Sequence, residues 1–235
     1  MNNVIIGIHQ PNFLPWFGYF LKIARSNKFV FLDDVQISNS SSYVNRTSIN
    51  INGKPKWLTA PIKRRKDNNI INKTKYLDTK WRVKAIKTLK INYGNALYFK
   101  ENEEFINNLI NYKSNWISEY NKFIITEICK ALDLSTPLYS AADFSINKTS
   151  TKRLLALIKS LDGNIYLSGS GGNKYQDVDI FESNFIQVKY NLFSHPRYNQ
   201  LKTNTLIAGL SIIDFIFNIG IKDTKLLLSN SLSYS

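Results

Sequence analysis

Short apolar runs alternate with helical patterns along this chain. Residues 4–8 and 28–32 are apolar runs of strand length, and apolar positions at helical spacing begin between them at Trp16. Further strand patterns cover residues 165–167 and 185–192, and helical patterns cover residues 80–93, 102–134, 150–161 and 206–219. This alternation predicts an α/β fold with a mostly parallel central sheet flanked by helices.

A hairpin is predicted in addition to that sheet. Residues 43–51 and 54–62 read as strands, and the Asn52-Gly53 pair between them is a strong two-residue turn signal. Ser114 is expected to cap the second half of the 102–134 helical pattern, and residues 144–146 to form a short strand. We find no internal repeat or disordered linker, and we expect one domain over residues 1–235.

Composition narrows the class of protein. The chain has 235 residues, of which 43% are hydrophobic and 13% aromatic, and this is enough for a substantial core. Its one cysteine, Cys129, excludes an internal disulfide and lies among apolar positions at helical spacing, as core cysteines do. No apolar run reaches the roughly 20 residues that span a bilayer, and no signal peptide is evident. We expect a soluble cytoplasmic protein without a transmembrane segment.

The net charge of +14 is concentrated in the first part of the chain. Residues 54–90 alone hold 13 Lys and Arg against 2 Asp and Glu. Such a stretch attracts anions, and three are considered: a nucleotide-sugar pyrophosphate, an RNA, or an anionic membrane surface. The alternative is that a composition rich in Asn, Lys and Ile produces the charge without a function.

Polar residues follow the first two predicted strands. His9 and Gln10 end the first strand, and Asp33 and Asp34 end the second. Ligands bind beyond the carboxyl ends of strands in open α/β sheets, so these residues are expected to share one edge. One of the two aspartates could orient His9, act as a base, or hold Mg²⁺ with a nucleotide diphosphate. One cysteine and two distant histidines do not make a zinc site.

Two later segments carry further candidate chemistry. Residues 168–172 form a Gly-rich loop after a strand, which can offer backbone N–H groups to phosphate or be a simple turn. His195 follows the last strand, and either histidine could be a general base or a hydrogen-bonded structural residue. Asp214 lies in an apolar helix and needs a partner if buried; it could cap a loop or orient a histidine.

Five pieces of this sequence resemble the WbqC-like family. They are HQPNFLPWFGYFLKI at residues 9–23, LDDVQ at 32–36, Asn45-Arg46, residues 166–172, and residues 195–200 leading to 211–220. The resemblance implies a role in bacterial O-antigen or surface-polysaccharide biosynthesis. The ligand-binding residues expected from these motifs are Gln10, Trp16, Lys22, Gln36, Asn45, Arg46, Ser168, Gly169, Ser170, Gly171, Gly172, Tyr198 and Gln200.

An enzyme is the favoured function class. It would modify a nucleotide-linked amino sugar by acyl or aminoacyl transfer, with an acyl donor or an aminoacyl-tRNA as partner. His9 is the preferred base over His195, and Trp16 or Trp57 could stack on a base or sugar. We expect His9, Asn45, Arg46, the Gly-rich loop and His195 to line one cleft.

Two other functions remain open. The order of strand, His-bearing loop and helix resembles nucleotidyltransferases of the HxGH class, but residues 16–19 stand in place of that motif and its second histidine is missing. The chain could also be a non-catalytic binding or assembly protein for polysaccharide synthesis, with weak contact to anionic membrane.

Overall fold

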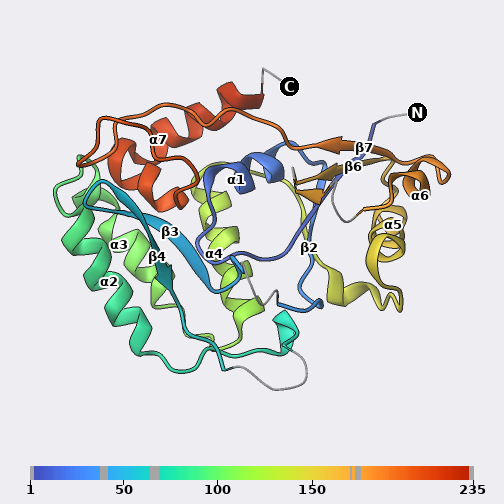
Figure 1. The fold of residues 1–235 in the computed structure, drawn as a ribbon, viewed down its shortest axis with the longest axis horizontal. Helices are drawn as coiled ribbons and strands as arrows, with labels where there is room; N and C mark the ends of the chain where they lie inside the picture. The colour runs from blue at the N-terminus through green and yellow to red at the C-terminus, as the bar shows by residue number, and fades with distance from the viewer. Residues whose placement is uncertain (1–2, 38–41, 64–68, 170, 173–175, 233–235) are drawn as a thin grey trace.

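The computed structural model describes residues 3–37, 42–63, 69–169, 171–172 and 176–232 (Figure 1). Ser170 and residues 64–66 of the basic stretch lie outside this part. In chain order the elements are β1 (Ile5–His9), α1 (Phe17–Ala24), β2 (Lys28–Phe31), β3 (Arg46–Ile51), β4 (Lys54–Thr59), the 3₁₀ helix η1 (Ile71–Lys73), α2 (Lys80–Tyr93), α3 (Phe99–Ile110), α4 (Ile117–Ala131), β5 (Leu138–Ser140), the 3₁₀ helix η2 (Ala141–Phe144), α5 (Ser150–Ser160), β6 (Ile165–Ser168), α6 (Val178–Glu182), β7 (Gln187–Tyr190) and α7 (Ile212–Leu232).

Within the described residues, five strands form a parallel sheet in the order β5-β2-β1-β6-β7. Strand β1 is central, and its Ile6 lies opposite both Lys28 of β2 and Tyr166 of β6. Strands β3 and β4 form a separate antiparallel sheet around the Asn52-Gly53 turn. The predicted parallel sheet with an added hairpin is therefore confirmed.

The side chains of the sheet alternate between two hydrophobic clusters. Ile6, Ile8 and Val30 enter the smaller cluster, which α5 and α6 cover, whereas Phe29 and Phe31 enter the larger one. Successive side chains of a strand point to opposite faces, so this alternation is what a sheet covered on both sides requires. Figure 1 shows α5 and α6 across the sheet from α1, α4 and α7.

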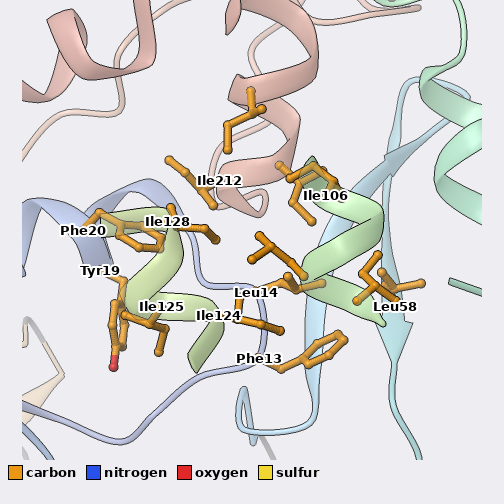
Figure 2. Close-up of a cluster of buried hydrophobic side chains, with 14 of the residues drawn as sticks. Phe13, Leu14, Tyr19, Phe20, Leu58, Ile106, Ile124, Ile125, Ile128 and Ile212 are labelled. Atoms are coloured by element: carbon orange, nitrogen blue, oxygen red, sulfur yellow. The ribbon is translucent and has the colours of Figure 1, made fainter. Parts of the chain in front are cut away.

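The larger cluster joins elements from both ends of the chain. Figure 2 shows its side chains converging from α1, α3, α4, α7, β4 and the segment after β1; those labelled are Phe13, Leu14, Tyr19, Phe20, Leu58, Ile106, Ile124, Ile125, Ile128 and Ile212. Cys129 is also buried there, as the sequence predicted. No helix in the described part of the chain is both long and apolar enough to cross a bilayer.

Three local predictions were wrong. Ser114 does not cap α4: its hydroxyl accepts a hydrogen bond from the Trp116 N–H at 3.1 Å, and Trp116 itself flanks the helix. The short strand is β5 rather than residues 144–146, because residues 141–144 continue from it as a 3₁₀ helix. Helix α7 begins six residues later than predicted, at Ile212, since the side-chain amide of Gln200 makes hydrogen bonds to both backbone groups of Ile207 and holds that segment as a loop.

Candidate functional site

The strand order reverses at β1. The chain passes from β1 to β2 and then to β5 on one side, and β6 returns to the other side of β1. Ligands bind at such reversals, beyond the carboxyl ends of the two strands. His9 ends β1 and Ser168 ends β6, so both lie at this place.

A cavity of about 130 Å³ lies at this reversal, and we name it the switch-point cavity. Four larger hollows, of about 770, 590, 340 and 340 Å³, are lined by residues away from the ends of β1 and β6. The switch-point cavity is lined by His9, Trp16, Gly18, Tyr19, Lys22, Gly169, Gly171 and Asn191. It therefore brings the end of β1, one face of α1 and the Gly-rich loop together.

His9 is held in one tautomer by its neighbour. Its Nδ1 lies 3.1 Å from the carbonyl oxygen of Gln10, which can only accept, so Nδ1 carries the proton and Nε2 is an acceptor. The Tyr19 hydroxyl donates to the same carbonyl at 3.0 Å, and its ring meets His9 edge-on. Burial and the nearby charge of Lys22 lower the pKa of His9 to about 3. His9 is therefore neutral at pH 7, and Gln10 acts through its backbone.

Lys22 is the second ionisable group of the cavity. Gly18, Tyr19 and Lys22 are three and four residues apart and so share one face of α1. Lys22 is 2% exposed, and its Nζ donates to the Ile8 carbonyl at 2.6 Å. It takes part in no ion pair with a described residue. Burial therefore lowers its pKa from 10.5 to about 7, and a substantial fraction of the amine is uncharged at neutral pH.

The Gly-rich loop presents open backbone to the cavity. A Cβ added to Gly169 or Gly171 would meet no atom within 4 Å, whereas one added to Gly172 would lie 2.1 Å from the Ser168 hydroxyl. Ser168 is buried and donates to the side chain of Gln176 at 3.0 Å, so it supports the loop instead of facing the cavity. The two open glycines are the part of this loop that a phosphate could approach.

Trp16 separates the two histidines. It lines the cavity, and its ring centroid is 5.6 Å from that of His195. His195 also contacts Phe193 at 5.0 Å and does not line the cavity itself. Burial lowers the pKa of His195 as well. The structure thus brings the segment after β1 and the segment around His195 together, but Trp16 lines the cavity and His195 contacts Trp16 and Phe193 beside it.

Asn191 and Tyr19 line the cavity and were not selected from the sequence. Asn191 follows β7, and its side chain donates to the Gly18 carbonyl at 3.0 Å and accepts from Arg25 at 3.0 Å. Its position directly after a parallel strand is the signal that could have identified it. Tyr19 gave no comparable signal, since it looks like one more apolar position of α1.

Residues 10–226 match the profile of the WbqC-like protein family. The chain belongs to this family. An uncharacterized protein of Mycobacterium tuberculosis (strain ATCC 25618 / H37Rv), Rv1507c, is 27% identical over 219 residues, which are 92% of this chain and 94% of that protein. No solved structure gives a significant match. The family membership expected from the motifs is confirmed.

Two acids of this WbqC-like chain, Asp33 and Asp34, bind other partners that the sequence could not reveal. Asp33 is 1% exposed and accepts hydrogen bonds from Ser118, Lys122 and Ser140 at 2.6–2.8 Å. Burial alone would raise the pKa of Asp33, but these donors lower it below its usual value. Asp34 pairs with Arg153 of α5, and burial nevertheless raises its pKa. Among the described contacts, neither carboxylate touches His9.

Asp214 belongs to a buried polar network in the WbqC-like fold. It accepts from the hydroxyls of Tyr93 and Tyr198 at 2.7 Å each, and from the amides of Gln200 and Asn218. None of these partners is a histidine, so the expected role of orienting one is not seen. Burial raises the pKa of Asp214. The network ties the loop that contains Tyr198 and Gln200 to α7.

The remaining candidates of the family motifs lie on or near the hairpin. Asn45 donates its side-chain amide to the Ala60 carbonyl at 3.1 Å, and the guanidinium of Arg46 lies 4.5 Å over the Trp57 ring. Gln36 forms an isolated bridge with Ile70. None of the three lines the switch-point cavity, so the predicted single cleft is assembled only in part.

The acids beside the sheet do not form a place that Mg²⁺ would fit. Asp33 already accepts hydrogen bonds from Lys122 and Ser140, and Asp34 is paired with Arg153. In the described residues, no three His, Cys, Asp or Glu side chains are placed to share a metal ion. These acids do not suit a magnesium ion at the cavity.

Proposed function

We propose that this WbqC-like protein is a transferase that acylates or aminoacylates the amine of a nucleotide-linked amino sugar in surface-polysaccharide biosynthesis. The observation that carries the proposal is the switch-point cavity. It sets a neutral imidazole and a lysine with a pKa of about 7 beside an open Gly-rich loop, where α/β sheets bind ligands.

The size of the cavity bears on how a substrate would bind. Its volume of about 130 Å³ is smaller than the roughly 300 Å³ at which drug-sized pockets begin. It suits the amine-bearing end of a sugar, with the nucleotide lying outside. Gly169 and Gly171 would meet the pyrophosphate through backbone N–H groups, and the Trp16 ring offers a surface for the sugar.

The chemistry asks for a base that works near neutral pH. The amine attacks the carbonyl carbon of an ester or thioester donor; a C–N bond forms, and the C–O or C–S bond to the leaving group breaks. Uncharged Lys22 accepts the proton that the amine loses and passes it to the leaving oxygen or sulfur. General bases work best with a pKa near the operating pH, which favours Lys22 over His9. His9 accepts an amine N–H at Nε2 and orients the nucleophile.

The test is turnover with a panel of nucleotide-linked amino sugars, selected first by thermal shift, and with thioester and aminoacyl-tRNA donors. Lys22→Met keeps the length of the side chain and removes the base, and it should lower kcat by about 10²–10⁴ while substrate still binds. Lys28→Met is the matched control, because the Lys28 amine donates to the Leu161 carbonyl and lines no part of the cavity. Full activity of Lys22→Met would refute this mechanism.

The same panel, extended by a nucleoside triphosphate with a sugar phosphate, separates the alternatives. Nucleotidyl transfer would release pyrophosphate from a nucleoside triphosphate and a sugar phosphate, without an acyl donor. A non-catalytic binding protein would give thermal shifts with no product from any donor. Either result would replace the proposed reaction.

A further inference from the structure

The hairpin carries an exposed aromatic and cationic cluster that has no part in the switch-point cavity. Tyr43 is 46% exposed and Trp57 is 49% exposed, and their ring centroids lie 5.5 Å apart. Arg46 stacks over the Trp57 ring at 4.5 Å. Large aromatic rings are usually buried, so two half-exposed rings side by side are available to a ligand.

A second pair of the same kind lies beyond the end of the hairpin. The Lys75 amine is 4.2 Å over the ring of Trp116, which is 39% exposed. Lys75 also accepts the Lys63 N–H with its carbonyl, at 2.9 Å, and Lys63 lies four residues after the end of β4. The two aromatic pairs are therefore joined by the chain that leaves the hairpin.

A groove of about 340 Å³ runs between β4 and α2, which lie side by side in Figure 1. Thr59 and Pro61 line one wall, and Lys80 and Lys84 line the other, with Asp78 as its one acidic lining residue. Trp57 precedes Thr59 by two residues and so points to the same face of the strand. Trp57 does not itself line the groove, which begins at the next residues of β4, Leu58 and Thr59.

The lysines of this surface are available to a partner. Lys54, Lys56, Lys75, Lys80 and Lys84 are exposed, and none forms an ion pair with a described residue. Unpaired cations beside exposed rings suit a ligand that alternates negative charge with flat surfaces.

We propose that the β4–α2 groove and the Tyr43–Trp57 cluster bind single-stranded nucleic acid. Lysines would follow the phosphates, and the rings would stack on unpaired bases. A duplex fits less well because its bases are already stacked inside. An anionic membrane also attracts lysines and interfacial Trp and Tyr rings, and vesicle binding is therefore one of the measured outcomes. The inference stands apart from the transferase proposal, although a nucleic-acid site would also suit an aminoacyl-tRNA donor.

The test measures binding without turnover, by fluorescence anisotropy of mixed-sequence single-stranded RNA and DNA of about 12 nucleotides, within the range of known single-strand sites. Trp57→Ala should raise Kd about tenfold or more, and Trp57→Phe should restore most of the affinity. Lys80→Gln with Lys84→Gln should reduce the slope of log K against log salt by about 1.4, or about 0.7 for each lost contact. Lys148→Gln with Lys152→Gln removes two exposed lysines around the start of α5 and should change neither quantity.

Inorganic polyphosphate separates stacking from charge, because it has no bases. Trp57→Ala should leave polyphosphate binding unchanged, whereas the double substitution Lys80→Gln with Lys84→Gln should weaken it. The proposal is overturned if Trp57→Ala binds single-stranded RNA and DNA with the affinity of the wild type. It is also overturned if this variant loses affinity for RNA and for polyphosphate to the same degree. It is also overturned if phosphatidylglycerol vesicles bind and neither strand does. The two strand types together show whether the site prefers RNA.

Discussion

His9 and Lys22 face one cavity from different elements, and the charge of Lys22 makes protonation of His9 less favourable. His9 comes from the end of β1 and Lys22 from the second turn of α1. Neither has a carboxylate partner in the described part of the chain, so burial controls both pKa values. Near neutral pH the cavity therefore holds an unprotonated imidazole and a partly unprotonated amine, and both can accept a hydrogen bond or a proton from an amine substrate.

The buried amine of Lys22 should make stability depend on pH. Its folded pKa of about 7 lies below the unfolded value of 10.5, so between these values the unfolded state binds more protons. Stability should fall as pH drops from about 10.5 to about 7 and change no further below that on account of Lys22. Lys22→Met removes this dependence. The free energy of unfolding of the variant should therefore exceed that of the wild type by an amount that grows as pH falls through that window, towards an upper bound of about 5 kcal/mol.

Urea denaturation at several pH values measures this effect, with Lys28→Met as the control. An equal stability difference at pH 7 and pH 10 would show that Lys22 is solvated and not the buried group described here.

His9 should stay neutral far into the acid range. Its pKa of about 3 predicts no titration between pH 5 and pH 8, and the Gln10 carbonyl fixes the proton on Nδ1. Nitrogen-15 NMR of the imidazoles reports tautomer and charge directly. The chain has only two histidines, so His195→Gln leaves the His9 signals alone in the spectrum. A His9 that titrates near its ordinary 6.5 would remove the argument for Lys22 as the base.

Alanine at two glycines of the site should affect different properties, stability at Gly18 and ligand binding at Gly169. A Cβ on Gly18 would lie 2.5 Å from the Phe193 ring, so Gly18→Ala should cost about 1–3 kcal/mol of stability. Gly169→Ala meets no atom within 4 Å and should change stability by less than about 0.5 kcal/mol. Its methyl group would instead stand where a phosphate approaches, so nucleotide-sugar binding should weaken. Chemical denaturation and calorimetric titration separate the two effects.

Asp214 should prove structural. Asp214→Asn replaces one acceptor oxygen by a donor opposite the hydroxyls of Tyr93 or Tyr198, which should cost about 1–3 kcal/mol. Activity per folded molecule should not change. Asp223→Asn alters an exposed acid of the same helix and should be neutral in a thermal melt. A fall in kcat at unchanged stability would return Asp214 to the catalytic candidates.

Sequence patterns predicted the secondary structure well where it depends on apolar periodicity within a single element. Helix α2 spans residues 80–93 as predicted, and β1 lies within one residue of its predicted bounds, because apolar periodicity reflects which face of an element is buried. The prediction failed at 144–146 and 206–211, where a short apolar run lacks periodicity and a side chain such as that of Gln200 decides the backbone path.

The sequence by itself determined the class of fold, the family, and the residues that end the central strands. Tertiary structure alone decided which of those residues meet. Asp33 was expected beside His9, but Lys122, 89 residues later, reaches it from α4. Lys22 was expected to bind a ligand, but its burial was not: packing holds its amine against the Ile8 carbonyl and lowers its pKa to about 7. Sequence periodicity indicates the face of an element on which a side chain lies. A pKa depends instead on how far the packed neighbours exclude solvent and on which charges and hydrogen-bond partners they place beside the group.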